Sequence, residues 1–317
     1  ETIEWLEDMG VEFEGAYKYF PRSEATWHIV KTDVGIGPRA ASFMNKALYA
    51  RAQELGVKVL LETPAKKIVM EDGKVAGVLA TDKDGNEVSV SCKAAIICTG
   101  GAGCNKQFIY DETGYKHGED MFNFAIPGIM GDGLKMAWEA GAAHLPVRIE
   151  QAAVIQGIDD LPGSVGNIMA QPNLLVNQFG KRVMNEDHMQ NTTFLSNVAS
   201  HQKGRVVYSI IDSTIAKYYM KNGVDNICLV RADPDVSDFV EAIKMAKDSG
   251  NTGMFIADSI EELAEMLGID PETLEDTVDE YNDYCDSTDE EFFKEKRFMR
   301  PLLKAPYYAA AIRPGGY

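Results

Sequence analysis

The spacing of apolar residues predicts alternating helices and strands at the start of the chain. Residues 2–9 are expected to form a short helix that Gly10 ends. Over residues 40–48, apolar side chains recur at the three-and-four spacing of a helix with one buried face, and Gly56 is its expected end. The apolar residues 57–61 then predict a short strand.

Three antiparallel strands are expected next. Residues 67–71 and 75–81 flank the turn sequence Asp72-Gly73-Lys74, and a second turn at 84–86 leads to residues 88–91. Each turn contains a glycine, which tolerates the positive φ that tight hairpins require. The pattern therefore predicts a small antiparallel ribbon.

An apolar run without polar alternation, residues 94–98, predicts a strand that is buried on both faces. It leads directly into Thr99, Gly100 and Gly101, where missing Cβ atoms let backbone N–H groups approach a phosphate or a flavin ring. A tight turn explains the same triplet. This loop is a candidate nucleotide-binding site.

A second glycine motif stands at the start of a predicted helix. Gly131, Asp132 and Gly133 precede apolar residues at helical spacing, and Gly141 is expected to end that helix. Free N–H groups at a helix start, together with the helix dipole, favour an anion. Asp132 acting as the N-cap explains the motif equally well. Both interpretations stay open.

The second half of the chain has a different pattern. Residues 174–185 predict a hairpin that turns near its middle, and residues 205–212 predict a strand. Ser259 and Asp270 each precede a helical pattern and are expected to cap the two helices. These elements predict an α+β domain at about residues 149–311, following an α/β domain.

Composition narrows the choice of partners. The 317 residues are 45% hydrophobic and 25% charged, which is typical of globular proteins with a sizeable core. The formal charge of −18 would repel nucleic acid and anionic membrane surfaces. Since no apolar run approaches the length of about 20 residues that spans a bilayer, membrane insertion is not expected either.

Cysteine and histidine spacing offers no metal site. The five cysteines are scattered without a Cys-x-x-Cys pair, and none of the five histidines lies at metal-ligand spacing to another. Unpaired cysteines favour a reducing compartment, so a cytoplasmic protein is predicted. The chain starts at Glu1 without a methionine, on what looks like a helix already under way. Residues are therefore expected upstream, and export stays open.

One motif points to a nicotinamide cofactor. The run from Gly35 to Ala40 fits the G-x-G-x-x-A variant of the dinucleotide fingerprint and is followed by a helix. A buried central strand should precede such a turn, but residues 29–34 contain Lys31, Thr32 and Asp33 in succession. A turn before a helix is the favoured interpretation, and an NAD-dependent dehydrogenase is the alternative.

Taken in order, the motifs resemble those of the fumarate reductase and succinate dehydrogenase flavoprotein superfamily. The resemblance covers nearly the whole chain. It is carried by Ala47 to Val59 with Gly73 to Val78, Ile96 to Gly101 with Asn105, Gly131 to Ala137, Leu175 to Arg182 with Asn185 and Glu186, and Ala305 to Ala309 with Pro314 and Gly315. It implies an α/β FAD-binding domain plus an α+β capping domain that closes over the substrate.

The resemblance also implies domain boundaries and a cofactor site. Residues 1–148 would be part of the FAD-binding domain, 149–311 the capping domain, and 312–317 a return to the FAD-binding domain. The family's N-terminal G-x-G-x-x-G segment and its closing segment lie outside this chain, so a fragment that holds FAD weakly on its own is expected. By motif match, the residues beside FAD would be Ala65, Thr99, Gly100, Gly101, Gly131, Asp132 and Gly133.

The positions that match the family's catalytic residues differ from the fumarate-reducing pattern. Ala153 replaces a histidine that grips a substrate carboxylate, and Gln190 replaces the proton-donating arginine. Because a dicarboxylate needs several cationic partners, the expected substrate is neutral or bulky and contains an activated C=C bond. Tyr317 replaces a substrate-binding histidine and is the first candidate acid, with His188 and Glu186 as alternatives.

Two function classes follow from the resemblance. The first is an FAD-dependent oxidoreductase that reduces or forms an activated C=C bond by hydride transfer with flavin N5, served by an electron donor protein or domain. The second is a non-catalytic relative that keeps the fold as a binding module. The losses at Ala153 and Gln190 favour the second class, and the ordered set of FAD-domain motifs favours the first.

Overall fold

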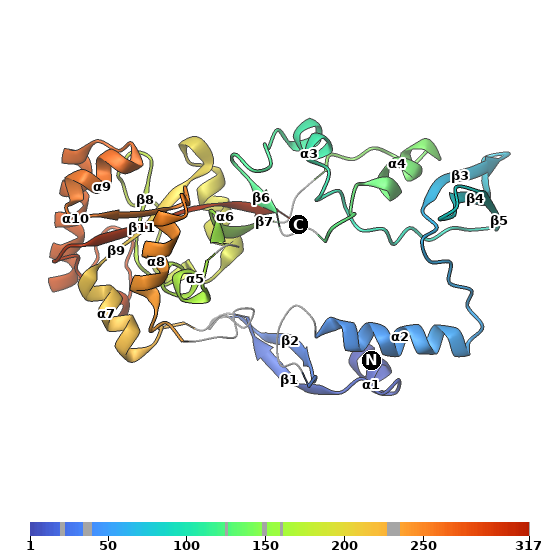
Figure 1. Cartoon of the computed structure of the whole chain (residues 1–317), viewed down its shortest axis with the longest axis horizontal. Coiled ribbons are helices and arrows are strands. Elements are labelled where there is room, and N and C mark those ends of the chain that lie inside the picture. Colours follow the sequence, from blue (N-terminus) through green and yellow to red (C-terminus); the bar gives the residue numbers. More distant parts are fainter. Residues whose placement is uncertain are drawn as a thin grey trace. The chain divides into compact units, whose positions relative to one another are not determined.

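The computed structural model describes residues 1–19, 23–33, 40–123, 126–147, 151–158, 161–226 and 235–316, with the side chains of Asn123 and Gln151 excepted. The chain divides into two units (Figure 1). One contains residues 1–55 and 151–314, and the other contains residues 56–150 and 315–317. The domain boundaries at 148/149 and 311/312 stay predictions.

The unit of residues 56–150 contains the predicted antiparallel ribbon. Strands β3 (Ala65–Glu71), β4 (Lys74–Thr81) and β5 (Glu87–Ser91) form a three-stranded sheet in that order, so the ribbon is confirmed. Two helices follow, α3 (Lys106–Thr113) and α4 (Asp132–Glu139). The short strand β6 (Phe122–Asn123) pairs in parallel with Gly315 and Gly316 at the end of β11 (Tyr307–Gly316).

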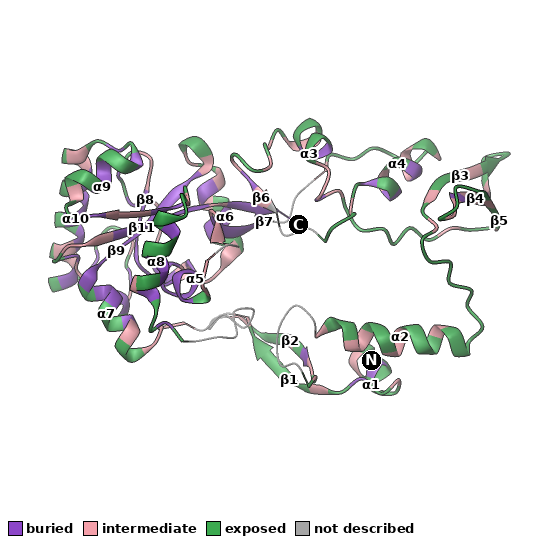
Figure 2. Cartoon of the chain, viewed as in Figure 1, coloured by how far each residue is buried: buried purple, intermediate pink, exposed green. Residues whose placement is uncertain are grey.

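Two predicted strands of this unit are wrong. Neither residues 57–61 nor residues 94–98 form a strand, and most of their apolar side chains are exposed (Figure 2). Leu61 is 73% exposed and Ile96 is 91% exposed. An apolar run becomes a buried strand only where neighbouring strands satisfy its N–H and C=O groups. None of the sheets in the described part of the chain extends to either segment.

Residues 1–19, 23–33 and 40–55 contain two helices and a hairpin. These elements are α1 (Thr2–Glu7), β1 (Phe13–Lys18), β2 (Ala25–Val30) and α2 (Ala41–Glu54). Both helices are confirmed. The expected buried face of α2 is only half-buried, because no residue of that helix is fully covered.

Strand β2 bears on the NAD alternative. Within the described part of the chain, it pairs only with β1, in an antiparallel two-stranded sheet, and it is partly exposed. A dinucleotide fold instead places a buried parallel strand before its glycine-rich turn. This agrees with the favoured interpretation of the Gly35 to Ala40 run as a turn, although residues 34–39 themselves lie outside the described residues.

Residues 151–314 build a larger α+β unit. Its sheet has the order β10-β11-β9-β8, and β7 also pairs with β11. The elements are β7 (Gln151–Ile155), α5 (Gly163–Met169), β8 (Leu174–Asn177), η2 (Glu186–His188), α6 (Thr192–Ser200), η3 (Lys203–Arg205), β9 (Val207–Asp212), α7 (Ser213–Asn222), α8 (Phe239–Asp248), β10 (Met254–Ala257), α9 (Ile260–Leu267), α10 (Pro271–Asp286), η4 (Lys296–Phe298) and β11. The predicted α+β character of this region is confirmed.

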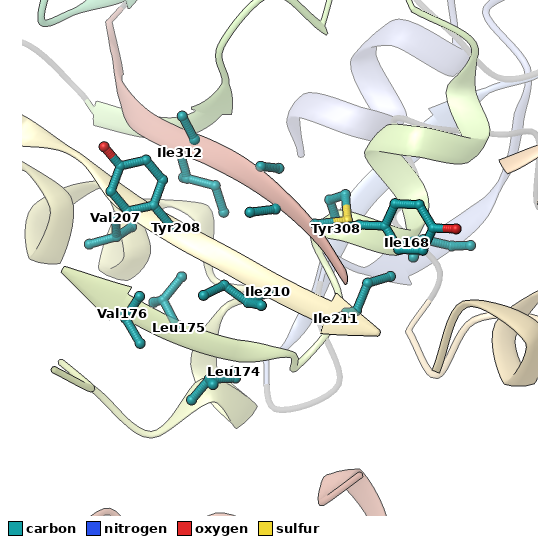
Figure 3. Packing of buried hydrophobic residues seen from close by; sticks show 14 of the residues in the cluster. Ile168, Leu174, Leu175, Val176, Val207, Tyr208, Ile210, Ile211, Tyr308 and Ile312 are labelled. Atoms are coloured by element: carbon teal, nitrogen blue, oxygen red, sulfur yellow. The ribbon is translucent and has the colours of Figure 1, made fainter. Parts of the chain in front are cut away.

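The core of this unit lies on both faces of its sheet. Every residue of β9 is buried, so helices must cover the sheet on two sides. Helices α5 and α7 contact β9, while α8 and α9 contact β10. Figure 3 shows Leu175 of β8 close to Ile210 of β9, and Leu174 is the register partner of Ile210. The absence of polar alternation in these strands encodes this two-sided burial.

Local signals of the larger unit are confirmed at atomic detail. The backbone of Asn177 donates to the Lys181 carbonyl at 2.9 Å and closes the predicted hairpin turn. The Ser259 hydroxyl accepts the Glu262 N–H at 3.0 Å at the start of α9. A carboxylate oxygen of Asp270 caps α10 in the same way, at 2.9 Å.

Candidate functional site

The two glycine motifs that are 30 residues apart in sequence meet in the structure. The N–H of Gly131 donates to the carbonyl of Gly101 at 3.1 Å. A Cβ atom on Gly133 would lie 2.1 Å from Thr99 Oγ1 and 2.5 Å from Ile97 Cγ2. Only a glycine at position 133 lets the start of α4 pack this closely on the loop, because any side chain would collide with it.

The start of α4 differs from one expectation. Asp132 is not the N-cap, because Gly131 occupies that position with a left-handed φ of 84° and no side chain caps the helix. A φ of this sign is costly for any residue with a Cβ atom, so the tight turn selected glycine there. Asp132 itself is exposed in the first turn.

Residues predicted to hold FAD therefore come together within one unit. Thr99, Gly100 and Gly101 are exposed, and Gly100 has a φ of 70° that turns the loop. Helix α4 packs against β3, the strand that Ala65 begins. Exposed glycine backbone beside a helix start can hold a phosphate or the edge of a flavin. These residues fit an FAD, and their contact with the cofactor stays a prediction.

An apolar pocket that sequence reasoning missed lies beside this loop. It has a volume of about 420 Å³, and Ala102, Phe108, Leu134, Trp138 and Leu145 are among its lining residues. The Trp138 ring stacks on Phe108 and on His144, at centroid distances of 5.8 and 3.9 Å. In the sequence, the large aromatic residue Trp138 in the predicted helix is a signal for such a cluster, and the structure shows this side chain half-buried.

The larger unit presents His188 and Gln190 on one short loop. The Asn185 side chain accepts the Asp187 N–H at 2.8 Å and starts η2, which ends at His188. Asn191 then caps α6, so Gln190 lies between two capped elements. Both candidate side chains are half-buried, and no described residue forms a hydrogen bond with either side chain. Each is therefore available to a ligand.

A pair of aromatic side chains from the first hairpin lies at the start of α6, next to this loop. The Tyr19 and Trp27 rings stack at 4.7 Å with an interplanar angle of 22°. The Tyr19 hydroxyl lies 3.4 Å from Thr192 Oγ1, two residues beyond Gln190. No residue pattern within the hairpin indicates this approach, because the contact joins residues that are 173 positions apart in the chain.

The remaining predicted residues have different surroundings. Ala153 lies on β7 with its methyl group in the core. Both carboxylate oxygens of Glu186 accept hydrogen bonds from Arg182, so this residue is committed to an ion pair. Tyr317 lies outside the described residues. Within the part of the chain that the structure describes, no group of His, Cys, Asp or Glu residues could hold a metal ion.

Comparison with known proteins decides the family. Residues 1–316 match the model of a family described as FAD binding domain. The chain belongs to this family. It is 27% identical to a vinyl phenol reductase of Lactiplantibacillus plantarum, over 100% of this chain and 65% of that protein. It is also 27% identical to an NADH:acrylate oxidoreductase of Vibrio harveyi, over 99% of this chain and 29% of that protein.

A solved structure supports the fold. The open conformation of a flavocytochrome c3 fumarate reductase matches with a TM-score of 0.59 and 21% identity, covering 99% of this chain and 50% of that chain. The predicted fumarate reductase-like FAD fold is thereby confirmed, as is FAD as the family's cofactor. The chain spans less than two thirds of the length of these relatives. Among the helices that the structure describes, none is long and apolar enough to cross a membrane.

Proposed function

We propose that this protein is a flavin-dependent oxidoreductase that reduces, or in reverse forms, an activated C=C bond. Membership of the FAD binding domain family supports the flavin, which supplies hydride transfer at N5 when bound. The names of the two similar proteins, a vinyl phenol reductase and an NADH:acrylate oxidoreductase, support the bond type. Thr99, Gly100, Gly101 and Asp132 would hold the cofactor, with Ala65 near the adenine.

The observation that carries the choice of substrate is the absence of positive charge at two positions. Ala153 and Gln190 stand where the resemblance expects a histidine and an arginine, and neither can form an ion pair with a carboxylate. The Ala153 methyl group is buried in the core and offers no hydrogen bond. A dicarboxylate bound there would lose water without gaining a cationic partner, so a neutral substrate is favoured.

The hairpin aromatics support a substrate that carries an aromatic ring. The stacked Tyr19 and Trp27 rings approach the start of α6 next to Gln190 and His188. Aromatic groups pair by offset stacking or edge-to-face contact, which adds about 0.5–1.5 kcal/mol beyond the buried area. We therefore propose an aryl alkene, such as a vinyl phenol, as the substrate class.

Each candidate side chain has a separate role in this proposal. The hydride adds to one alkene carbon, and a proton must reach the other carbon to complete the reduction. Tyr317 is the first candidate donor of that proton, and His188 is the second. The Gln190 amide can orient a polar group of the substrate, but it has no proton to give at neutral pH.

The test uses the complete protein loaded with FAD. Photoreduce the flavin without oxygen, mix the enzyme with 4-vinylphenol, acrylate or fumarate, and follow reoxidation by stopped flow. The vinyl phenol should reoxidise the flavin at least about tenfold faster than fumarate, a difference of about 1.4 kcal/mol. Faster reoxidation by fumarate would refute the substrate class. No reoxidation by any of the three would favour the non-catalytic binding module.

Matched variants separate the two proton donors. Tyr317→Phe keeps the ring without the hydroxyl, and His188→Asn removes the imidazole. Loss of the true donor should lower the reduction rate by about 10²–10⁴-fold. His201→Asn is the control, because this exposed histidine follows the end of α6 and its ring hydrogen-bonds only locally. If both variants match this control, neither residue donates the proton.

A further inference from the structure

A buried ionic cluster lies directly behind the loop that carries His188 and Gln190. The Arg182 guanidinium donates two hydrogen bonds to Glu186, at 3.0 and 2.8 Å, and two to Asp289, at 2.9 and 2.8 Å. The exposed fractions of these side chains are 2%, 0% and 0%. Only an arginine offers donors in this fixed fork geometry.

Lys294 adds a second buried cation. Its ammonium group donates to the Tyr281 hydroxyl at 2.8 Å and lies 3.7 Å from a Glu186 oxygen. Its backbone N–H donates to Asp289 at 3.0 Å. Two cations thus face two fully buried carboxylates, and a third carboxylate, that of the exposed Glu291, lies 3.4 Å from Arg182.

Hydrogen bonds between side chains of residues 185–187 and the backbone of residues 289–295 add to the ionic cluster. The Asn185 amide donates to two carbonyls of the segment 289–295, at 3.0 and 3.2 Å. The Glu295 N–H donates to the Asp187 carboxylate at 2.8 Å. Three consecutive residues are therefore joined to the segment 289–295. Asn185 and Asp187 bond to it directly, and Glu186 is joined to it through Arg182. His188 is the next residue along the chain.

We infer that Arg182, Glu186, Asp289 and Lys294 form an ionic clamp that positions His188 and Gln190. This inference rests on the proposed function. Replacing a buried ion pair by apolar residues of similar volume is often neutral or stabilising in proteins, so a gain in stability is weak grounds for four buried charges. Directional hydrogen bonds between fixed partners instead hold the loop in one geometry. The four residues of the clamp are positioning residues, because none of them has to touch the substrate.

The test compares two carboxylates of the same unit. Asp289→Asn removes one charge of the clamp and keeps the side-chain shape. Asp225→Asn is the matched control, because Asp225 pairs with Arg300 through two contacts of 2.8 Å and touches no residue of the loop 185–190. Hydrogen exchange of peptides covering 185–191, read by mass spectrometry on the full chain, reports the loop without any need for activity.

The clamp predicts a local result. In Asp289→Asn, exchange in 185–191 should rise by about tenfold or more while the strands β8 and β9 stay protected. Asp225→Asn should leave 185–191 unchanged. Equal exchange in the two variants would overturn the inference. Lys294→Met offers a second, milder variant if Asp289→Asn does not fold, with the same expected pattern.

Activity gives a separate readout. In the flavin-loaded complete protein, kcat of Asp289→Asn should fall by about 10- to 100-fold with little change in KM, as expected for a misplaced catalytic group. An unchanged kcat beside a loosened loop would overturn the positioning role. If the wild-type protein reduces no alkene, the proposed function fails, whereas the exchange data still decide whether the clamp orders the loop.

Discussion

Replacing Gly133 by alanine should disrupt the contact between the two glycine motifs. The added Cβ would lie 2.1 Å from Thr99 Oγ1 and 2.5 Å from Ile97 Cγ2, distances that no unstrained packing allows. Either the start of α4 or the loop 97–101 must move. Such overpacking costs about 1–3 kcal/mol. For a unit of this size, each kcal/mol lowers Tm by about 4–8 °C.

The assay reads the unfolding of this unit alone. Trp5 and Trp27 lie in the other unit, so replacing both with phenylalanine leaves Trp138 as the sole tryptophan. Trp138 lies on α4 and stacks on His144, and its fluorescence should therefore change when the helix detaches. In the variant that keeps only Trp138, Gly133→Ala should lower the Tm of this unit, measured by tryptophan fluorescence during thermal unfolding.

Two controls make the prediction specific. A Cβ on Gly101 would meet nothing within 4 Å, so Gly101→Ala should leave Tm nearly unchanged. Thr99→Ala removes the closest clashing atom, and combining it with Gly133→Ala should recover part of the loss, with a coupling of about 0.5–3 kcal/mol. A Tm for Gly133→Ala equal to that of the parent would refute the packing argument.

Three further predictions concern the larger unit. Burial opposes ionisation of Asp289, but hydrogen bonds from Arg182 and from backbone N–H groups outweigh it and hold its pKa well below the ordinary value. Ionised Asp289 therefore stabilises the folded state at neutral pH, and this stabilisation is lost as acid protonates the carboxylate. Asp289→Asn should reduce the fall in the free energy of unfolding between about pH 5 and pH 2, measured by urea unfolding. Burial raises the pKa of Cys285 to about 11, so at pH 8 iodoacetamide should modify the exposed Cys98 at least about 100-fold faster, as mass spectrometry can measure. Asp212→Ala should cost about 2 kcal/mol or more in urea unfolding, because this buried carboxylate accepts four backbone N–H groups.

Specific outcomes would contradict each of these three. An acid transition as steep in Asp289→Asn as in the parent would show that this carboxylate does not control it. Equal labelling of Cys285 and Cys98 would mean that the core around α10 opens readily. For Asp212, the matched control is Asp270→Ala, which removes an exposed cap and should cost about 1 kcal/mol. Equal losses for the two variants would contradict the larger role of the buried cap.

Signals carried by a few neighbouring residues predicted the local structure. The ribbon of β3, β4 and β5 follows from its turn sequences, and the caps at Ser259 and Asp270 follow from residue type and position alone. These features depend on hydrogen bonds within a few residues, so the sequence around them is sufficient. The ordered motifs likewise identified the FAD-binding family before its fold was known.

Burial and long-range contacts were decided by the tertiary structure. The apolar runs 57–61 and 94–98 have the composition of strands, yet only neighbouring segments determine whether such runs pair. Arg182 and Asp289 are 107 residues apart, and no local pattern indicates that they form one buried pair. The sequence by itself therefore determined the local elements and the family. The contacts behind His188 and Gln190 required the fold, because they arise where distant segments meet.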